Sequence, residues 1–441
     1  MTDATFSPSS GGTTSLYKTD PLTKKRNAAE KRFKMYGISA VLIGLFFLVV
    51  LAFSIISEGI PAFTRTAVEV EFTITKAQQE AAEKELFKTK AYEGFLISAL
   101  KSQLEESGVE VPFDGKAIQR IVGKTGGTIR AFFRENPDQL GKPVDFELAA
   151  SSRVDGYMNG RITRDSLVDS RFLNKADLDI ADALVKAGVI KTAFNWNFIT
   201  GADSGVDNPG GAGIGASVVG SFFMMLVVLF LSLPIGVAAS IYLEEFAPQN
   251  RFTDLIEVNI SNLAAVPSIV FGILGLAVFI QFMHLPQSAP IVGGLVLTLM
   301  TLPTIIISTR ASLKAVPPSI RDAALGIGAS KMQAVFHHVL PLAMPGILTG
   351  TIIGLAQALG ETAPLLLIGM VGFVARGYPD GFLEGFIEPN SAMPAQIYTW
   401  AARADYAFYE KAWGGIIVLL VFLLTMNILA IILRRRFERR W

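Results

Sequence analysis

A single acidic side chain, Glu361, interrupts an otherwise uncharged run from Val339 to Ala375. An ionisable group in so apolar a stretch is costly, which makes it a candidate functional residue. Gln357 precedes it by one helical turn, so the two side chains share one face of a helix, and Thr362 follows directly. A second interpretation is that Glu361 and Thr362 merely cap a helix break before Pro364.

Residues 321–341, with the sequence RDAALGIGASKMQAVFHHVLP, form a second candidate site. The first half carries very small side chains, which allow another body to approach the backbone closely. The second half has one helical stripe, spaced i, i+3, i+4 and i+7, made by Met332, Val335, Phe336 and Val339. Pro341 ends this pattern because proline has no N–H group. The sequence predicts a helix, a turn and an amphipathic helix: either a docking surface for a cytoplasmic partner or a helical hairpin on the membrane.

Composition narrows the class of protein. Of 441 residues, 51% are hydrophobic and 17% are charged, against about 25% charged residues in average soluble domains. The net charge of +1 gives no electrostatic basis for binding nucleic acid. The chain has no cysteine and three histidines, so we expect no thiolate metal site and no cofactor.

Six long uncharged runs lie along the chain, each close to or above the roughly 20 residues that a helix needs to cross a bilayer. They are Ile38 to Ser57, Gly210 to Leu243, Val258 to Met283, Leu285 to Thr309, Val339 to Gly360 and Ala412 to Leu433. In lipid the backbone must satisfy its own hydrogen bonds, so these runs must be helices. The alternative, buried core helices of a large soluble protein, does not suit six such runs. We therefore predict an all-α polytopic membrane protein with six transmembrane helices.

Basic residues flank the first and last runs, and such residues mark the cytoplasmic side of a membrane. Both termini are then cytoplasmic, which six crossings allow. The expected segments are a disordered tail (1–35), a first span (36–58), an extracytoplasmic insert (59–209), a five-helix core (210–433) and a basic tail (434–441). The candidate loop, residues 320–340, then lies in the cytoplasm, where Arg310, Lys314, Arg321 and Lys331 also place it.

The insert has the character of a small α+β domain. Apolar and polar residues alternate from Val68 to Ile74, which predicts a strand. Residues 76–104 and 176–187 are expected to be helices, the second capped by Asn174. Gly123-Lys124-Thr125 lacks the earlier glycine of a phosphate-binding loop, since residue 118 is Ile. We find no nucleotide site in the sequence and expect a transport subunit, not an enzyme.

The spacing of the candidate loop resembles the EAA loop of ABC importer permeases. The matching positions are Asp322, Ala323, Ala324, Gly328, Leu340 and Pro341. In that family the loop docks into a groove of the ATPase subunit. Here Asp322 stands where Glu is usual, and the negative charge is kept.

Other stretches resemble the phosphate importer permeases of the PstA type. They are GILTGTIIGLAQALGETAPLLLIG (346–369), NWNFITG (195–201), IYLEEFAP (241–248) and AAVPSIVFGI (264–273). The resemblance covers residue 195 to the C-terminus and the first span, but not the insert. Many PstA sequences have Arg where this chain has Gln357, so direct binding of phosphate at that position is not implied. A carboxylate repels phosphate, which favours gating or helix pairing for Glu361.

The resemblance implies a multi-pass subunit of the cell inner membrane that imports inorganic phosphate. Its implied partners are a PstC-like permease, a dimer of PstB-like ATPases, a PstS-like phosphate-binding protein and membrane lipid. A permease for another oxyanion, sulfate or molybdate, is the nearest alternative. A membrane-anchored sensor is a third hypothesis, against which the six spans and the EAA-like loop argue.

Overall fold

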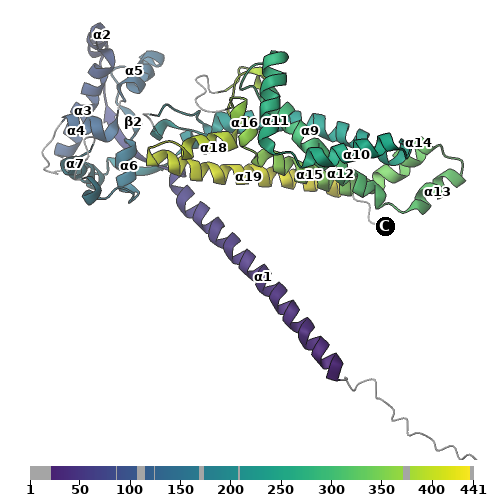
Figure 1. Ribbon diagram of the computed structural model, residues 1–441. Coiled ribbons are helices and arrows are strands. Elements are labelled where there is room, and N and C mark those ends of the chain that lie inside the picture. Colours follow the sequence, from purple (N-terminus) through teal and green to yellow (C-terminus); the bar gives the residue numbers. More distant parts are fainter. Residues whose placement is uncertain are drawn as a thin grey trace, which may run out of the picture. The chain divides into compact units, whose positions relative to one another are not determined.

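The computed structural model describes residues 21–441 except 86, 107–114, 124, 168–172, 207–208, 371–377 and 438–441. Its first helix, α1, runs from Pro21 to Gly59 (Figure 1). We expected disorder up to residue 35, and for residues 21–35 that prediction is wrong. Pro21 suits the first turn of a helix, and the Ala, Lys, Glu and Arg residues after it are good helix formers. Residues 1–20 lie outside the described part of the chain.

The membrane-spanning core consists of long apolar helices, as predicted. They are α9 (Gly215–Ile241), α12 (Pro290–Lys314), α15 (Leu340–Gly360) and α19 (Tyr406–Phe437). A bent pair adds α10 (Arg251–Ala264) and, 102° from it, α11 (Ser268–Leu274) with the π-helix η6 (Gly275–Phe282). With α1, the described residues contain five helices able to span a membrane, or six if the bent pair forms one span.

Small residues bring α15 close to α12, and both run alongside α9 (Figure 1). A Cβ atom at Gly350 would lie 2.1 Å from the hydroxyl of Ser308, and one at Gly346 would lie 2.4 Å from that of Ser312. Larger side chains at these glycines would therefore push the helices apart. The four-residue spacing of Gly346, Gly350 and Gly354 thus forms a helix-packing stripe.

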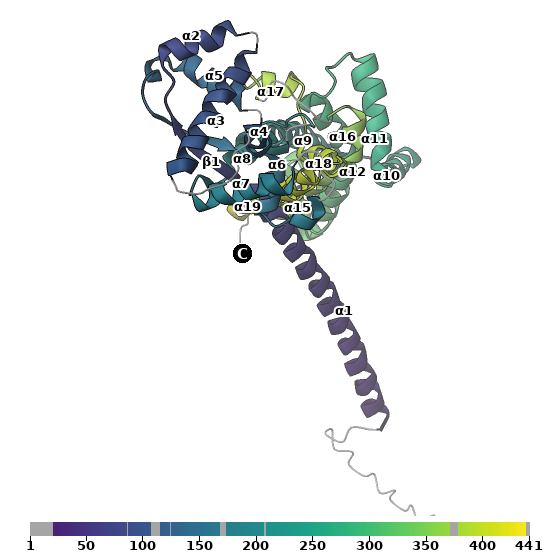
Figure 2. The ribbon, with the colours of Figure 1, turned by 90° about the vertical axis from the view of Figure 1, so that its left-hand side faces the viewer.

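The insert contains a three-stranded antiparallel sheet in the order β2-β1-β3. The strands are β1 (Thr64–Phe72), β2 (Val144–Ala149) and β3 (Ile190–Phe194). Helices surround the sheet (Figure 2): α2 (Lys76–Lys84), α3 (Lys88–Glu106), α4 (Gly115–Val122), α5 (Gly126–Glu135), α6 (Ser152–Met158) and α7 (Lys175–Lys186). The α+β insert is therefore confirmed.

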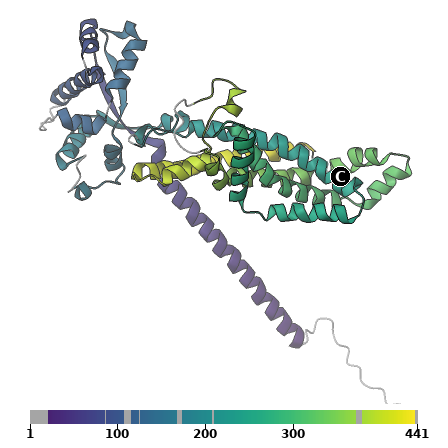
Figure 3. The same cartoon turned by 45° about the horizontal axis from the view of Figure 1, so that its top comes forward.

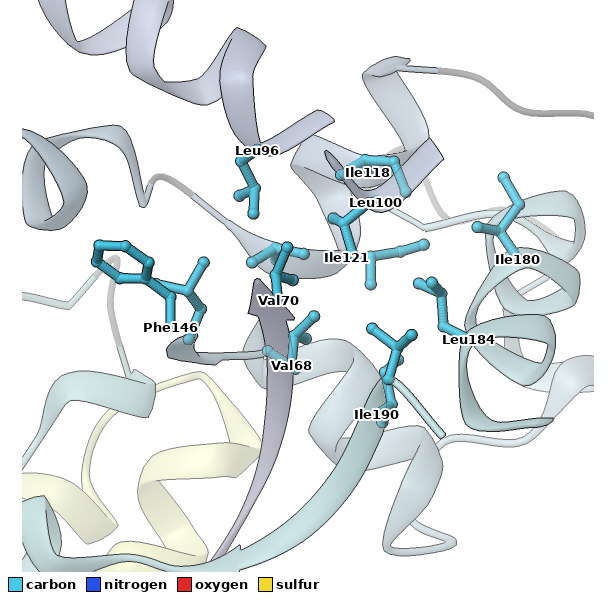
Figure 4. Close-up of a cluster of buried hydrophobic side chains, with 14 of the residues drawn as sticks. Val68, Val70, Leu96, Leu100, Ile118, Ile121, Phe146, Ile180, Leu184 and Ile190 are labelled. Carbon is cyan, nitrogen blue, oxygen red and sulfur yellow. The ribbon is translucent and has the colours of Figure 1, made fainter. Parts of the chain in front are cut away.

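The predicted strand is β1, and its alternation explains the core of the insert. Val68 and Val70 point into a buried cluster with Leu96, Leu100 and Ile121 (Figure 4). The side chain of Asn174 caps α7 by accepting a hydrogen bond of 2.9 Å from the Asp177 N–H, as expected. The helix expected over residues 76–104 is broken between α2 and α3. Arg130 on α5 binds both oxygens of Glu83, at 2.6 and 2.9 Å, and so holds the end of α2 against α5.

The insert joins the core through buried polar contacts at the first turns of α19. Asp155 accepts hydrogen bonds of 2.8 Å from the backbone and the hydroxyl of Thr66, and it pairs with Arg161 at 3.0 Å. Arg161 also pairs with Glu410 on α19. Both Glu410 and its neighbour Lys411 are buried. Charged groups that are this well buried need partners, so the insert and the N-terminal end of α19 are firmly connected.

The insert and the candidate loop lie at opposite ends of the core helices. The insert joins the core where α9 and α19 begin, whereas the loop follows the end of α12 (Figure 1). Arg434, near the end of α19, donates a hydrogen bond of 3.0 Å to Thr349 in the middle of α15. Because α19 begins at the insert and runs for 32 residues, Arg434 lies toward the loop end of the core.

Candidate functional site

Residues 318–340 form the predicted helix, turn and helix. The first helix is α13 (Pro318–Gly326), and the second begins as α14 (Lys331–Ala334) and continues as the π-helix η7 (Val335–Val339). Ser330 begins α14 with a reciprocal cap, in which its hydroxyl accepts from the Gln333 N–H at 3.2 Å. Between the helices Gly328 has a φ of +90°, a conformation that residues with a Cβ adopt only at a cost.

The hairpin projects from the end of the core (Figure 3). The sequence of its turn is rich in small residues, and the surface that they form is called the small-residue surface. Asp322, Ala323 and Gly328 are exposed, whereas Ala324 is buried against the core. A Cβ atom added at Gly326 or at Gly328 would meet no atom within 4 Å. The surface is therefore open to a second protein, and the predicted residues 322, 323 and 328 lie together on it.

The expected apolar stripe of the second helix is wrong in part. Val335 and Val339 are buried in a cluster with Ile241 and Leu313, as a stripe requires, but Met332 and Phe336 are exposed. The π-helical turn η7 explains the difference, because its wider turn rotates successive residues away from the α-helical spacing. Two positions of the expected stripe therefore remain available for contacts outside the chain.

The expected helix end at Pro341 is also wrong. The chain stays helical from Lys331 to Gly360, and Pro341 lies in the first turn of α15. The π-helical turn η7 comes directly before Pro341. The backbone hydrogen bonds have therefore already departed from the α-helical pattern at the point where the proline lacks an N–H group. Leu340 packs against the buried cluster and Pro341 is exposed. These two residues begin the membrane helix and do not belong to the small-residue surface.

Gln357, Glu361 and Thr362 lie where α15 ends. Ile353 is 59% exposed and Gln357, one turn later, is also exposed, so this face of α15 is not covered by the described chain. Glu361 is half-buried and leaves the helix with an extended backbone (ψ 130°), and Thr362 precedes the short helix α16 (Ala363–Leu367). No described residue forms an ion pair with Glu361.

A cavity of about 210 Å³ lies elsewhere, between α9, α15 and α19. Its lining is almost wholly apolar and includes Met225, Leu348, Leu355 and Leu423, with Asn427 among its few polar groups. Transfer of a charged solute into such a lining would be very costly. The uncovered face of α15, which carries Gln357, is therefore the better candidate for a polar pathway.

The sequence analysis missed one group of residues beside the loop. It used Arg310 and Arg321 as markers of membrane orientation only, but both form ion pairs with the adjacent acids Glu244 and Glu245. Two consecutive glutamates at the end of an apolar helix were the available signal. Such a pair needs cations nearby unless it is fully solvated.

Comparison with known proteins identifies the family. A family model described as a binding-protein-dependent transport system inner membrane component matches residues 232–441. The chain is 33% identical over 244 residues to the probable ABC transporter permease protein YqgI of Bacillus subtilis, covering 54% of this chain and 82% of that protein. It is 30% identical to the phosphate transport system permease protein PstA of Haemophilus influenzae, covering 48% and 72%. The chain belongs to the PstA-like family of ABC importer permeases.

The family assignment explains the core and leaves the insert open. A second family model, a domain of unknown function (DUF3333), matches residues 20–167, which include α1 and most of the insert. A solved structure of the MetNI methionine ABC transporter is similar to 51% of this chain and 94% of its own, with a TM-score of 0.36 and 15% identity. As a PstA-like permease, the chain is a membrane transport subunit.

Gly328 provides a test of the loop. Gly328→Ala forces a Cβ into a left-handed conformation and should destabilise the turn by about 1–2 kcal/mol, whereas Gly326→Ala should be neutral because the position is helical and open. We expect Gly328→Ala to reduce transport and Gly328→Trp, which also covers the small-residue surface, to abolish it. Uptake and membrane insertion are measured together. Full uptake in Gly328→Trp would exclude this surface from the function.

Glu361 provides a test of the α15 face. Glu361→Gln keeps the shape of the side chain and removes its charge, and Glu361→Leu removes both polarity and charge. If the carboxylate acts in gating or pairs with a partner, both variants should insert normally and lose most of their transport. Glu384→Gln, which removes an exposed carboxylate at the start of α17, serves as the matched control for loss of charge. Parent-level transport in both Glu361 variants would leave Glu361 as a local helix break only.

Proposed function

We propose that this chain is a permease subunit of an ATP-driven importer of inorganic phosphate. The observation that carries the proposal is the similarity of its core to PstA permeases, together with the GETAPLL stretch that ends α15 and begins α16. The described residues place the open small-residue surface at one end of the core and the uncovered polar face of α15 within it. A subunit that couples ATP hydrolysis to transport needs both features.

The small-residue surface is proposed to dock an ATPase subunit. Asp322, Ala323 and Gly328 are exposed, as is Ile327 between the two glycines, and a Cβ atom added at Gly326 or Gly328 would meet no atom within 4 Å. A PstB-like ATPase dimer is the proposed partner, and its closure on ATP would move α13. ATP hydrolysis then belongs to that partner, since this chain supplies the docking surface and no nucleotide site.

The transport pathway is proposed to form between this chain and a PstC-like permease. Ile353 and Gln357 face outward from α15, and Glu361 has no ion-pair partner among the described residues. A half-buried carboxylate in a membrane helix needs a polar neighbour, which a second permease would provide. Because a carboxylate repels phosphate, we assign Glu361 to gating or to helix pairing. A PstS-like binding protein would deliver phosphate from outside.

The insert is proposed to lie outside the membrane and to modulate transport without forming the pathway. Two family models cover separate parts of the chain, one over α1 and most of the insert and the other over the core. The insert joins the core at the end opposite the loop, through Arg161 and Glu410. From this position it would contact the binding protein or the external part of the partner permease.

We propose an orientation in which both termini and the loop are in the cytoplasm. Arg310, Lys314 and Arg321 gather at the loop end, where Arg434 also lies. Positive charge beside membrane spans favours the cytoplasmic side. Cysteines introduced at residues 10, 130 and 330 test this, since the natural chain has no cysteine. An impermeant thiol reagent added to intact cells should label residue 130 and neither of the others. Labelling of 330 from outside would reverse the orientation.

Uptake of labelled phosphate tests the substrate. Cells that depend on this chain should import phosphate, and deletion of the chain should remove ATP-dependent uptake. Sulfate and molybdate serve as competitors, because a permease for another oxyanion would be inhibited by its own substrate. The proposal would be refuted if phosphate uptake did not depend on the chain and the transport that does depend on it were inhibited by excess sulfate or molybdate.

A further inference from the structure

Arg321 links three helices at the cytoplasmic end of the core. Its guanidinium binds Glu245, with a shortest N–O distance of 2.6 Å, and both Nε and Nη2 take part. The same group donates to the carbonyl oxygens of Val316, at 2.8 Å, and Leu313, at 3.0 Å. Leu313 lies in the last turn of α12 and Val316 just after that helix, and Glu245 belongs to the π-helix η5 (Tyr242–Phe246) that follows α9.

The arm of the hairpin after the turn also contacts η5. The ammonium group of Lys331, at the beginning of α14, lies 5.3 Å from the ring centre of Phe246, within the range of a cation–π contact. Arg321 before the turn and Lys331 after it therefore bind consecutive residues of one short segment. The small-residue surface lies between these two attachments.

The other glutamate of η5, Glu244, makes a second connection to α12 and, through Arg310, one to α10. Glu244 accepts from Arg310 on α12 at 3.3 Å and lies 3.6 Å from Lys314. Arg310 also binds Glu257 on α10 at 2.5 Å. The segment η5 thus forms ion pairs with α12 and α13, it is linked to α10 through Arg310, and it continues directly from α9.

The contact between Arg321 and Glu245 is held in a fixed geometry by its burial and by the planar shape of the guanidinium. The side chain of Glu245 is 7% exposed and that of Arg321 is 22% exposed, so water screens the pair less than it screens a surface pair. A planar guanidinium that binds a carboxylate through two nitrogens fixes direction as well as distance, which the point charge of lysine does not. The guanidinium of Arg321 is held further by the hydrogen bonds that it donates to the carbonyl oxygens of Leu313 and Val316.

We propose that Arg321 and Glu245 form a joint through which movement of α13 is transmitted to α9, α10 and α12. The inference rests on the proposed function, because it takes the adjacent surface of Asp322 and Ala323 as the ATPase contact. Asp322 is exposed while Arg321 faces the core. Asp322 would thus receive the movement of the ATPase, and its neighbour Arg321 would transmit that movement to the core. Arg321 and Glu245 are positioning residues and do not touch the transported solute.

Spin-label distances test the joint independently of the substrate. Gln249→Cys and Leu325→Cys introduce two exposed sites into a chain without natural cysteine. In the full-length chain in nanodiscs, we expect one narrow distance distribution, which broadens in Arg321→Ala and in Glu245→Gln. Arg321→Lys should give an intermediate width. The matched control is Arg251→Ala, which removes an exposed cation from the start of α10 and should leave the distribution unchanged.

Coupling is measured on the assembled importer with its ATPase subunits. In Arg321→Ala and Glu245→Gln the phosphate transported per ATP hydrolysed should fall about tenfold, while the ATPase still copurifies. The double variant should lose no more than either single one, because both act through one contact. If the parent assembly transports no phosphate, the proposed substrate is wrong, and the distance measurement still tests the joint.

Two results would overturn the proposal. One is an unchanged distance distribution together with an unchanged ratio of transport to hydrolysis in both single variants. The other is loss of the ATPase from Arg321→Ala with the spin-label distances unchanged, which would make Arg321 a docking residue and not a joint.

Discussion

The lack of water in the hydrocarbon layer is the constraint on which the whole core depends. Backbone groups must pair within each helix, and hydroxyls inside the core bond to carbonyls of their own helix, as Thr298 does to Gly294 and Ser240 to Gly236. Among the described residues of the core, the ion pairs accordingly lie at its ends. Arg161 pairs with Glu410 where the insert joins the core, and Arg310, Arg321 and their glutamates lie beside the loop. The mechanical connections of the protein are therefore made at its two polar ends.

The core combines closely packed helices with π-helical segments near the ends of spans. Gly346 and Gly350 bring α15 onto α12, so the two helices have little room to slide. Three π-helical segments in the described part of the chain lie at the ends of spans. The segment η5 follows α9, η6 ends the bent pair, and η7 comes directly before α15 and Pro341. Segments of this kind frequently occur at functional positions. Two of the three here carry the residues that join the hairpin to the core.

The sequence predicted the spans, the strand of the insert and the cap by Asn174 because each depends on a local pattern. Hydropathy alone defines a span, alternation defines β1, and a side chain three residues from its partner defines a cap. The apolar stripe of the loop was only half right, since a π-helical turn changes the spacing without any mark in composition. The pairing of Arg321 with Glu245 joins residues 76 positions apart. No single-sequence pattern specifies which of several cations each of two adjacent glutamates will bind.

The ends of the core and the exposed face of α15 differ in a way that supports the proposed pairing with a second permease. Its polar ends are satisfied internally: Asp203 accepts hydrogen bonds from Trp400 and Arg403 near the insert, and Glu245 binds Arg321 near the loop. The face of α15 with Ile353 and Gln357 is exposed in contrast, and its neighbour Glu361 has no ion pair among the described residues. A folded chain with stiff ends and one uncovered polar face suits one half of a pathway. Movement delivered at α13 would then act on that face through helices that are already held together.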